Sequence, residues 1–528
     1  MSGDIESAAA AAVRLAGGAR LGSVLAVADP DAWLALDAGV RESTWHRSRF
    51  QPRWEHDAAL PADLNGLDES RLALALCHRV GRIRERAVRS SGGRSGLLPL
   101  IVIRSADWAA PVREHARQLL REALDMDAAL GLAPLILRVG RRDRGAFGVD
   151  ALSQVLGQAC RGQLAVLFRS SDRDVRRFAY RLAVERRLLG RTELARTAAR
   201  DSDTVVQDLC ATAALSVLDD EDAWEEAVAL LLSARNPRTR SAGVTALRRT
   251  GLAAQAETFL ADRSALVRAC ARYVVRQAGG DPTAWYRQRC TAPDDLASTP
   301  GAVIGLAECG NRGDAALLWP LITHSVAAVR VRAVAGLRTL DCADPHRLRP
   351  LLDDPAAGVV RETVLALLPC ATDLPGTWLL ERTSAERPRH IRVGALRLLD
   401  ARGGIVALRV AVGLLEDPDA KLRFRAGQSV LRWNPTSNAR YGDAEVAELL
   451  ERSRHLFSAA STQMGGRGEQ LGPESSGRCR RSRSAPGASA ASASRPGHLY
   501  GIEIPLVAIY RRARAVLWGR ARGRGRGS

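Results

Sequence analysis

Apolar residues recur along the middle of the chain in groups of three, with four residues from each to the next. Val329, Ala333 and Leu337 form one such group. Residues at i, i+4 and i+8 lie on one face of an α-helix, so each group predicts a helix with a single apolar face. An arginine follows the first member of most groups, and we number each repeat from this arginine as position zero. The most regular copies are spaced 31 residues apart: Arg330, Arg361, Arg392 and Arg423.

Earlier copies of the same pattern are less regular but keep its apolar face. The residue at position +3 is usually small, which allows a neighbouring helix to approach closely. Gly243 and Cys210 both stand at this position, so we interpret Cys210 as a packing residue rather than a nucleophile. The earlier position-zero residues are Arg84, Arg113, Arg176, Gln207, Arg240 and Arg268.

A second apolar helix is predicted in the other half of each period. Leu348, Leu379 and Val410 all follow their arginine by 18 residues. Asp354-Pro355 and Asp417-Pro418 lie between the two helices, where Asp caps the following helix and Pro fits its first turn. Neither helix can bury its apolar face alone, so the units must stack. The pattern predicts an all-α fold, an α-solenoid of about 11–12 helix–turn–helix repeats of about 31 residues.

Three regions are expected. Residues 1–65 lack the period and predict an irregular helical N-terminal cap, residues 66–457 form the solenoid, and residues 458–528 form a tail. The cap contains an aromatic and histidine cluster that either covers the end of the core or forms a ligand pocket. Its members are Trp45, His46, Trp54, His56 and Asp57.

The tail is rich in Ser, Gly and Arg and cannot supply a core, which predicts disorder. Its last segment, GIEIPLVAIYRRARAVLWGRARGRGRGS, pairs a short apolar run with basic residues and leaves a membrane-surface or RNA contact open. Of the formal net charge of +19, the segment from Arg452 onward carries +12, because 15 arginines there face three glutamates. The high isoelectric point therefore mostly reflects the tail.

Two repeats depart from the pattern. The unit around residue 145 and the unit at Thr299 have both lost the apolar residue followed by arginine, although Ala302 and Leu306 keep the register of the second one. Irregular units can mark a binding site or a bend, and they also arise by ordinary decay of a repeat.

The cysteines and the N-terminus indicate an intracellular protein. All nine cysteines stand singly, without the paired spacing of zinc ligands or of a disulfide framework. The N-terminal segment lacks a basic start and a long apolar stretch, so it is not a signal peptide. No apolar run approaches the ~18 residues of a membrane span. We expect a cytoplasmic location.

The stretches LLDDPAAGVVRETVLALL and LLEDPDAKLRFRAGQSVL, with the period near 31, resemble HEAT repeats, in particular the PBS-lyase-type HEAT-like repeats of bacteria. The resemblance covers roughly residues 66–455. It implies a ladder in which turn aspartates bind arginines of adjacent repeats, and it implies that second helices line the concave face. Asp354, Asp417, Arg330, Arg361, Arg392 and Arg423 would then be structural.

Some HEAT-like proteins ligate bilins or excise alkylated bases, so the resemblance leaves a lyase or a glycosylase-type enzyme as an alternative. Asp107-Trp108 offers only a loose match to the acid and aromatic residues of such glycosylases. The chain contains no GxxxxGK[ST], GxSxG, HExxH or glycine fingerprint. We therefore predict no catalytic residues, no cofactor and no metal.

The candidate functional surface is a set of additional arginines on the second helices. Spacings of four residues place them in rows, which would form a basic stripe able to meet an acidic protein or phosphates. Alternatively, they occupy the solvated helix face. The candidates are Arg113, Arg117, Arg121, Arg177, Arg181, Arg268, Arg272 and Arg276.

From these patterns we expect a non-catalytic scaffold or adaptor that binds a protein partner through the solenoid surface. A nucleic-acid-binding solenoid that uses an Arg-rich concave face is the alternative.

Overall fold

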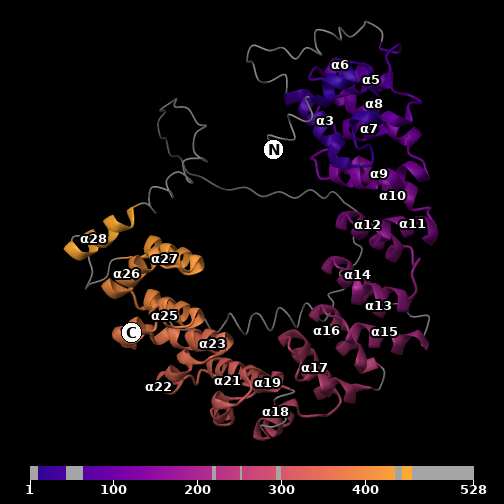
Figure 1. Ribbon diagram of the computed structural model, residues 1–528. Helices are drawn as coiled ribbons and strands as arrows, with labels where there is room; N and C mark the ends of the chain where they lie inside the picture. Colours follow the sequence, from indigo (N-terminus) through magenta and orange to yellow (C-terminus); the bar gives the residue numbers. More distant parts are fainter. Residues whose placement is uncertain are drawn as a thin grey trace, which may run out of the picture. The chain divides into compact units, whose positions relative to one another are not determined.

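The computed structural model describes residues 10–42, 64–216, 222–249, 252–292, 296, 299–434 and 443–454. Every regular element within these ranges is a helix (Figure 1). The predicted aromatic and histidine cluster of the N-terminal region and the predicted tail lie outside the described residues. The prediction of an all-α fold is confirmed.

Twelve helix pairs follow one another in the described residues, and each consists of a first helix, a turn and a second helix. The first six pairs are α5 (Glu69–Leu76) with α6 (Gly81–Arg89), α7 (Leu98–Arg104) with α8 (Ala110–Ala123), α9 (Met126–Val139) with α10 (Ala146–Leu156), α11 (Arg161–Phe168) with α12 (Arg173–Glu185), α13 (Arg191–Arg200) with α14 (Thr204–Ser216), and α15 (Asp222–Leu232) with α16 (Pro237–Ala246).

In the next six pairs several first helices are short or of the 3-10 type. They are η3 (Ala253–Phe259) with α17 (Ala265–Gln277), α18 (Pro282–Thr291) with α19 (Gly301–Cys309), α20 (Ala315–Leu318) and η6 (Pro320–Thr323) with α21 (Ala327–Thr339), α22 (Pro345–Leu348) and η7 (Arg349–Asp353) with α23 (Ala357–Leu367), α24 (Gly376–Glu381) with α25 (Arg389–Arg402), and α26 (Gly404–Gly413) with α27 (Ala420–Arg432). Pro320 and Pro350 lie inside two of these first helices, where they remove a backbone donor.

The remaining elements lie at the two ends of the array and beside the paired helices. They are α2 (Leu21–Val24), α3 (Pro30–Glu42), η1 (Ser95–Leu97), η2 (Leu247–Arg249), η5 (Arg312–Asp314), η8 (Leu368–Asp373), η9 (Leu414–Glu416) and α28 (Ala444–Arg452). Helix α3 packs on α7 and α9 and buries Trp33, Leu36 and Val40.

Each pair stacks on the next through like helices. Second helix α12 contacts α14, α21 contacts α23, and α23 contacts α25, while first helix α13 contacts α15 and α7 contacts α9. Contacts therefore run between neighbours in sequence, as expected for a solenoid in which single pairs cannot bury their apolar faces.

The predicted apolar face of the second helices forms the core. In α8, Val112, Ala116 and Leu120 at positions −1, +3 and +7 are all buried. The small residue at +3 is required where helices approach closely: a Cβ atom on Gly243 would lie 3.0 Å from the Leu232 backbone nitrogen of α15.

Both irregular units are complete helix pairs. In α10 the apolar face is shifted along the chain, so that Gly148, Leu152 and Leu156 fill the core. In α19, Ala302 and Leu306 are fully buried and keep the register expected from Thr299. The loss of the arginine therefore does not interrupt the stack.

Candidate partner-binding surface

The arginine at position zero joins two successive turns. Arg330 donates from Nη1 to the carbonyl oxygens of His324 (2.8 Å) and Ser325 (3.0 Å) at the turn before its helix. Its Nε and Nη2 donate to the two carboxylate oxygens of Asp354 in the next turn, at 2.8 and 2.9 Å. Asp354 in turn accepts from the backbone nitrogen of Ala356 (2.8 Å) and fixes the start of α23.

The same arrangement recurs along the stack with small variations. At four turns the aspartate that receives one arginine also presents its backbone carbonyl to the next position-zero residue, so at these turns the contacts link successive repeats in a ladder. Its acid contacts are Arg84 to Asp107, Arg176 to Asp201, Arg240 to Asp262, Arg330 to Asp354 and Arg392 to Asp417. Its carbonyl contacts are Arg113 to Asp107, Gln207 to Asp201, Arg268 to Asp262 and Arg423 to Asp417.

Arg361 does not take part in this ladder. Its side chain is 67% exposed, and its Nη2 lies 3.4 Å from the adjacent Glu362 instead of a turn aspartate. The physical reason lies in the next turn, where Ala385 stands at the position that Asp354 holds relative to Arg330. The structure thus differs from the expectation for Arg361.

Arg268 was expected to contact a partner, but the structure places it inside the fold. Its guanidinium is buried and donates from Nη1 to the Asp262 carbonyl oxygen (2.7 Å) and from Nε to Glu308 (3.1 Å). Arg272 also binds Glu308, at 2.7 Å. Glu308 belongs to α19, the second helix of the unit that lost its arginine, and so replaces a turn aspartate.

The other inner members of the predicted rows also bind the chain itself. Arg117 donates to the carbonyl oxygens of Ser105 (3.0 Å) and Arg144 (3.1 Å), and burial together with the nearby Arg113 and Arg121 lowers its pKa. Arg177 binds both carboxylate oxygens of Asp203, at 2.9 and 2.7 Å. These bonds hold the pKa of Asp203 below its usual value.

The outer members of the rows are exposed. Among the described residues, Arg121, Arg181 and Arg276 form no ion pair with an acid. Arg121 stands with its guanidinium carbon 4.7 Å from the ring centroid of Phe147 in the next repeat. The N–H groups of the Arg121 guanidinium remain available to a ligand, because stacking on a ring leaves them at the edge of the guanidinium plane.

The structure reveals a repeat position that the sequence rows only partly identified. Arg121 and Arg276 both stand at position +8, and two further exposed arginines, Arg248 and Arg338, share it. Arg248 donates to the Tyr273 hydroxyl of the next repeat (2.9 Å), and Arg338 approaches Glu362 of the next repeat at 3.4 Å. Alignment of all copies by position zero could have found this set.

Tryptophans of the first helices hold a separate group of arginines. Arg347 lies 3.8 Å above the ring of Trp319, Arg382 lies 4.1 Å from that of Trp378, and Arg191 lies 4.7 Å from that of Trp224. Much of the chain's arginine content is thus used within the fold, on both kinds of helix.

The acid of the loose glycosylase match is inaccessible. The Asp107 side chain is fully buried and accepts from Arg84 (2.9 and 2.8 Å) and Arg104 (3.0 Å), with Arg41 3.6 Å away. A carboxylate enclosed by three guanidinium groups cannot reach a substrate. The adjacent Trp108 is 64% exposed.

The cysteine and histidines considered as candidates also pack or form hydrogen bonds within the fold. Cys210 is buried, and burial raises its pKa to about 12, as expected for a packing residue. His390 contacts the Asp354 carbonyl oxygen through Nε2 (3.1 Å), and His115 contacts that of Pro111 through Nδ1 (2.8 Å). In the described ranges, no three His, Cys, Asp or Glu side chains are placed to hold a metal ion.

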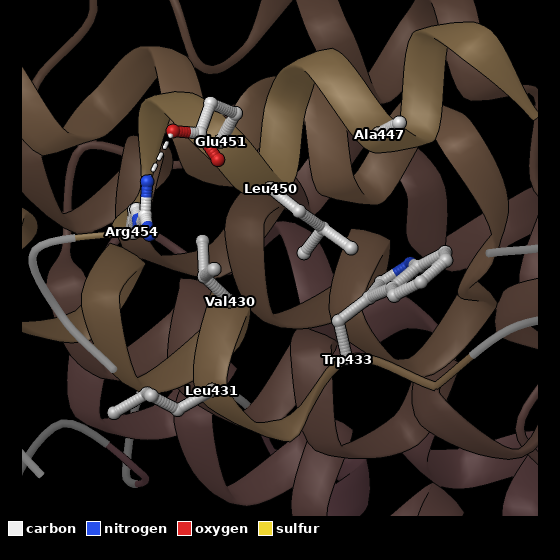
Figure 2. A pocket seen from close by; sticks show the side chains of 7 residues that line it. All are labelled: Val430, Leu431, Trp433, Ala447, Leu450, Glu451 and Arg454. Carbon is white, nitrogen blue, oxygen red and sulfur yellow. Dashed lines mark hydrogen bonds and ion pairs between the residues drawn. The ribbon is translucent and has the colours of Figure 1, made fainter. Parts of the chain in front are cut away.

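One hollow lies at each end of the described stack. The larger, about 580 Å³, lies among apolar side chains that include Leu21, Trp33 and Leu132, with Glu69 as its acid. The other, about 340 Å³, lies between α27 and α28, and its Glu451 and Arg454 pair with each other (Figure 2). Neither hollow brings together the several titratable groups that a catalytic pocket needs.

The geometry of the described repeats identifies their type. Helix pairs, an aspartate in the turn, an arginine in the second helix and bonds between adjacent turns occur together. The chain is a HEAT-like α-solenoid. Within the residues that the structure describes, every helix is too short or too polar to cross a membrane.

Comparison with known proteins adds solved structures only. No protein-family model and no curated protein matches the chain. Similar structures include the karyopherin Kap121p bound to the SUMO protease Ulp1p, with 13% identity, a TM-score of 0.28, and coverage of 77% of this chain and 51% of that one. Importin beta is 14% identical with a TM-score of 0.31, and the match covers 88% of this chain and 76% of importin beta. An engineered protein is 14% identical with a TM-score of 0.20, and the match covers 68% of this chain and 97% of the engineered one.

The chain thus spans about half the length of the Kap121p structures that it matches. TM-scores of this size do not show a shared arrangement over the matched length, so the partner of this chain does not follow from them.

Proposed function

We propose that this HEAT-like solenoid is a non-catalytic adaptor that binds an acidic segment of a protein partner along its second helices. The contact residues are the exposed arginines at position +8, namely Arg121, Arg248, Arg276 and Arg338. Arg181, at position +5 of α12, is a further candidate. The observation that carries this proposal is their recurrence at one exposed repeat position, in units that use their position-zero arginine for the ladder.

The location of these arginines at the seam between repeats supports the proposal. Arg121 stacks on Phe147 and Arg248 lies 6.0 Å from the ring centroid of Tyr273, and each ring belongs to the following repeat. Stacking restricts the long side chain before a ligand arrives and so reduces the entropy lost on binding. A guanidinium held in this way presents paired donors that match a carboxylate.

The neutralised inner arginines favour a protein over a nucleic acid. Arg177, Arg268 and Arg272 bind Asp203 or Glu308, so the surface alternates in charge and is not a continuous basic stripe. A duplex with regularly spaced phosphates is best neutralised by a continuous stripe. Scattered carboxylates on a protein match isolated arginines.

The proposal is tested by replacing the +8 row with neutral residues of similar length. The variant is R121Q/R248Q/R276Q/R338Q, and the matched control is R142Q/R169Q/R200Q/R387Q, which removes four exposed arginines outside the second helices. Each protein is used as bait in a nuclease-treated lysate of the source cells, and the captured proteins are quantified by mass spectrometry.

We expect a protein that wild type and control recover equally and that the +8 variant recovers roughly tenfold less. Exposed charge pairs contribute about 0.2–1 kcal/mol each, so four of them account for a loss of this size. Equal recovery by both variants contradicts the proposal. Capture that occurs only in a parallel lysate without nuclease supports the nucleic-acid alternative instead.

A further inference from the structure

The last second helix, α27, carries an apolar stripe on its outer side. Phe424 is 69% exposed and Leu431 is 38% exposed. They are seven residues apart, which places them on one face and about 10 Å apart along the axis. The opposite face of α27, with Leu422, Ala426 and Val430, is buried in the core.

These two residues occupy repeat positions that face the following second helix elsewhere in the stack. Phe424 stands at position +1, where Val331 of α21 comes close to Gly358 of α23. Leu431 stands at position +8, where Arg338 approaches Glu362 of α23. The stripe therefore points to the place that a further second helix would take.

That place is not taken by α28. Helix α28 packs on α26, through a side that includes Val446 and Leu449. In Figure 2, Leu450 of α28 lies near Val430 and Trp433, where the hollow of about 340 Å³ opens beside the stripe. The hollow lies next to Leu431, and its lining combines the apolar Leu450 and Trp433 with the paired Glu451 and Arg454.

The charges around the stripe are positive. Lys421, Arg425 and Arg432 are exposed on one flank of α27, and the helix contains no acidic residue. Among the described residues the side chains of Lys421 and Arg425 form no ion pair. The nearby acids Asp419 and Glu451 are bound to Arg389 and Arg454.

From these observations we propose that the exposed face of α27 docks an acidic amphipathic helix of a partner protein, which stacks on the array as a further second helix would. Its apolar residues cover Phe424 and Leu431 and reach the hollow beside them. Its carboxylates lie along the flank of Lys421, Arg425 and Arg432. The docked helix thereby buries an apolar stripe that is otherwise exposed to water.

This contact extends the proposed adaptor function to a second surface and does not use Arg121, Arg248, Arg276 or Arg338. A direct binding assay separates the two. The probe is a labelled 18-residue helical peptide with leucines on one face and glutamates on its flanks, and fluorescence anisotropy with the full chain measures its Kd. A second peptide carries lysine in place of every glutamate.

The variants are F424D and K421E/R425E, and the matched control is V166D. Val166 is 61% exposed on first helix α11, so V166D adds the same charge at a similarly exposed apolar site. Because all these residues lie at the surface, the variants are expected to keep the wild-type circular dichroism spectrum.

We expect the acidic peptide to bind the wild type and V166D equally. Its Kd for F424D and for K421E/R425E should be higher by a factor of roughly ten or more. The lysine peptide should not bind. Absence of saturable binding by the acidic peptide, or equal binding of both peptides, overturns the proposal. It is also overturned if sedimentation shows that the wild type self-associates and F424D does not, because a second copy then covers the stripe.

Discussion

Arg330 donates to two backbone carbonyls and to both oxygens of Asp354, whereas Arg338, eight residues later on the same helix, keeps 43% of its side chain exposed. The two arginines differ because they lie at different places along the helix. Position zero lies next to two turns and meets carbonyls and a carboxylate there. Position +8 lies near the C-terminal end of the helix, where Arg338 approaches Glu362 and Arg248 reaches Tyr273 of the next repeat. The same side chain therefore stabilises the stack at one position and is available to a partner at the other.

At this scale the buried pairs of the ladder should contribute more to stability than exposed ion pairs, and replacement of Arg84 by alanine tests this. Arg84 and Asp107 have almost no exposed side-chain surface, so the R84A variant leaves a buried carboxylate with fewer partners. Removal of one member of a buried pair costs about 3–5 kcal/mol. We expect a marked fall in the thermal unfolding midpoint of the N-terminal repeats, measured by circular dichroism.

The matched control is R312A. Arg312 and Asp341 pair at 2.8 Å, but their side chains are 70% and 88% exposed. Such pairs contribute less than about 1 kcal/mol, so this midpoint should hardly change. Equal shifts for R84A and R312A would show that burial does not determine the contribution of these pairs.

At the scale of the helix pair, the sequence was sufficient to predict the repeat but not its exceptions. The apolar residues at −1, +3 and +7 and the turn aspartates specify the two helices, because each local feature agrees with the stacked fold. The α19 unit kept its register despite losing the arginine, since Ala302 and Leu306 still fill the core. Burial of the apolar face, rather than the ladder, therefore maintains the stack at that unit.

The sequence could not show which arginines are neutralised within the chain. Glu308 binds Arg268 from 40 residues away, and nothing in the local pattern of either helix links the two. The exposure of Arg361 could have been predicted, because the sequence has Ala385 in place of the aspartate in the next turn, but the contacts of Glu308 could not. The interactions that separate structural from exposed arginines are thus tertiary.

Close packing at position +3 gives a prediction for the helix pair α15–α16. A Cβ atom on Gly243 would lie 3.0 Å from both the Leu231 Cβ atom and the Leu232 backbone nitrogen. We expect G243V to force the two helices apart and to destabilise the protein by about 1–3 kcal/mol, as overpacked cores do. The measurement is the unfolding midpoint in urea.

The control for this prediction is G413A in α26. A Cβ atom on Gly413 meets nothing within 4 Å, and the residue is helical with φ −61°. Alanine should therefore leave stability unchanged or raise it slightly. Tolerance of valine at position 243 would contradict the role assigned to the small residue.

At the scale of the whole chain, the residues of a repeat that stabilise the stack differ from those that we propose to contact a partner. Ladder arginines and apolar residues hold successive pairs together, and the exposed ends of the second helices carry the candidate contacts. The first helices use Trp224, Trp319 and Trp378 to hold arginines in place. An adaptor of this kind binds by extended surface and not by a deep pocket, which agrees with the two hollows and their few titratable groups.

The most direct test of this account is a hydrogen–deuterium exchange footprint of the full chain with and without its captured partner. The account predicts that bound partner slows exchange around residues 121, 248, 276 and 338, at the ends of the second helices, while the first helices α11, α13 and α15 exchange as before. Slower exchange confined to the first helices, with no change around the four arginines, would contradict it.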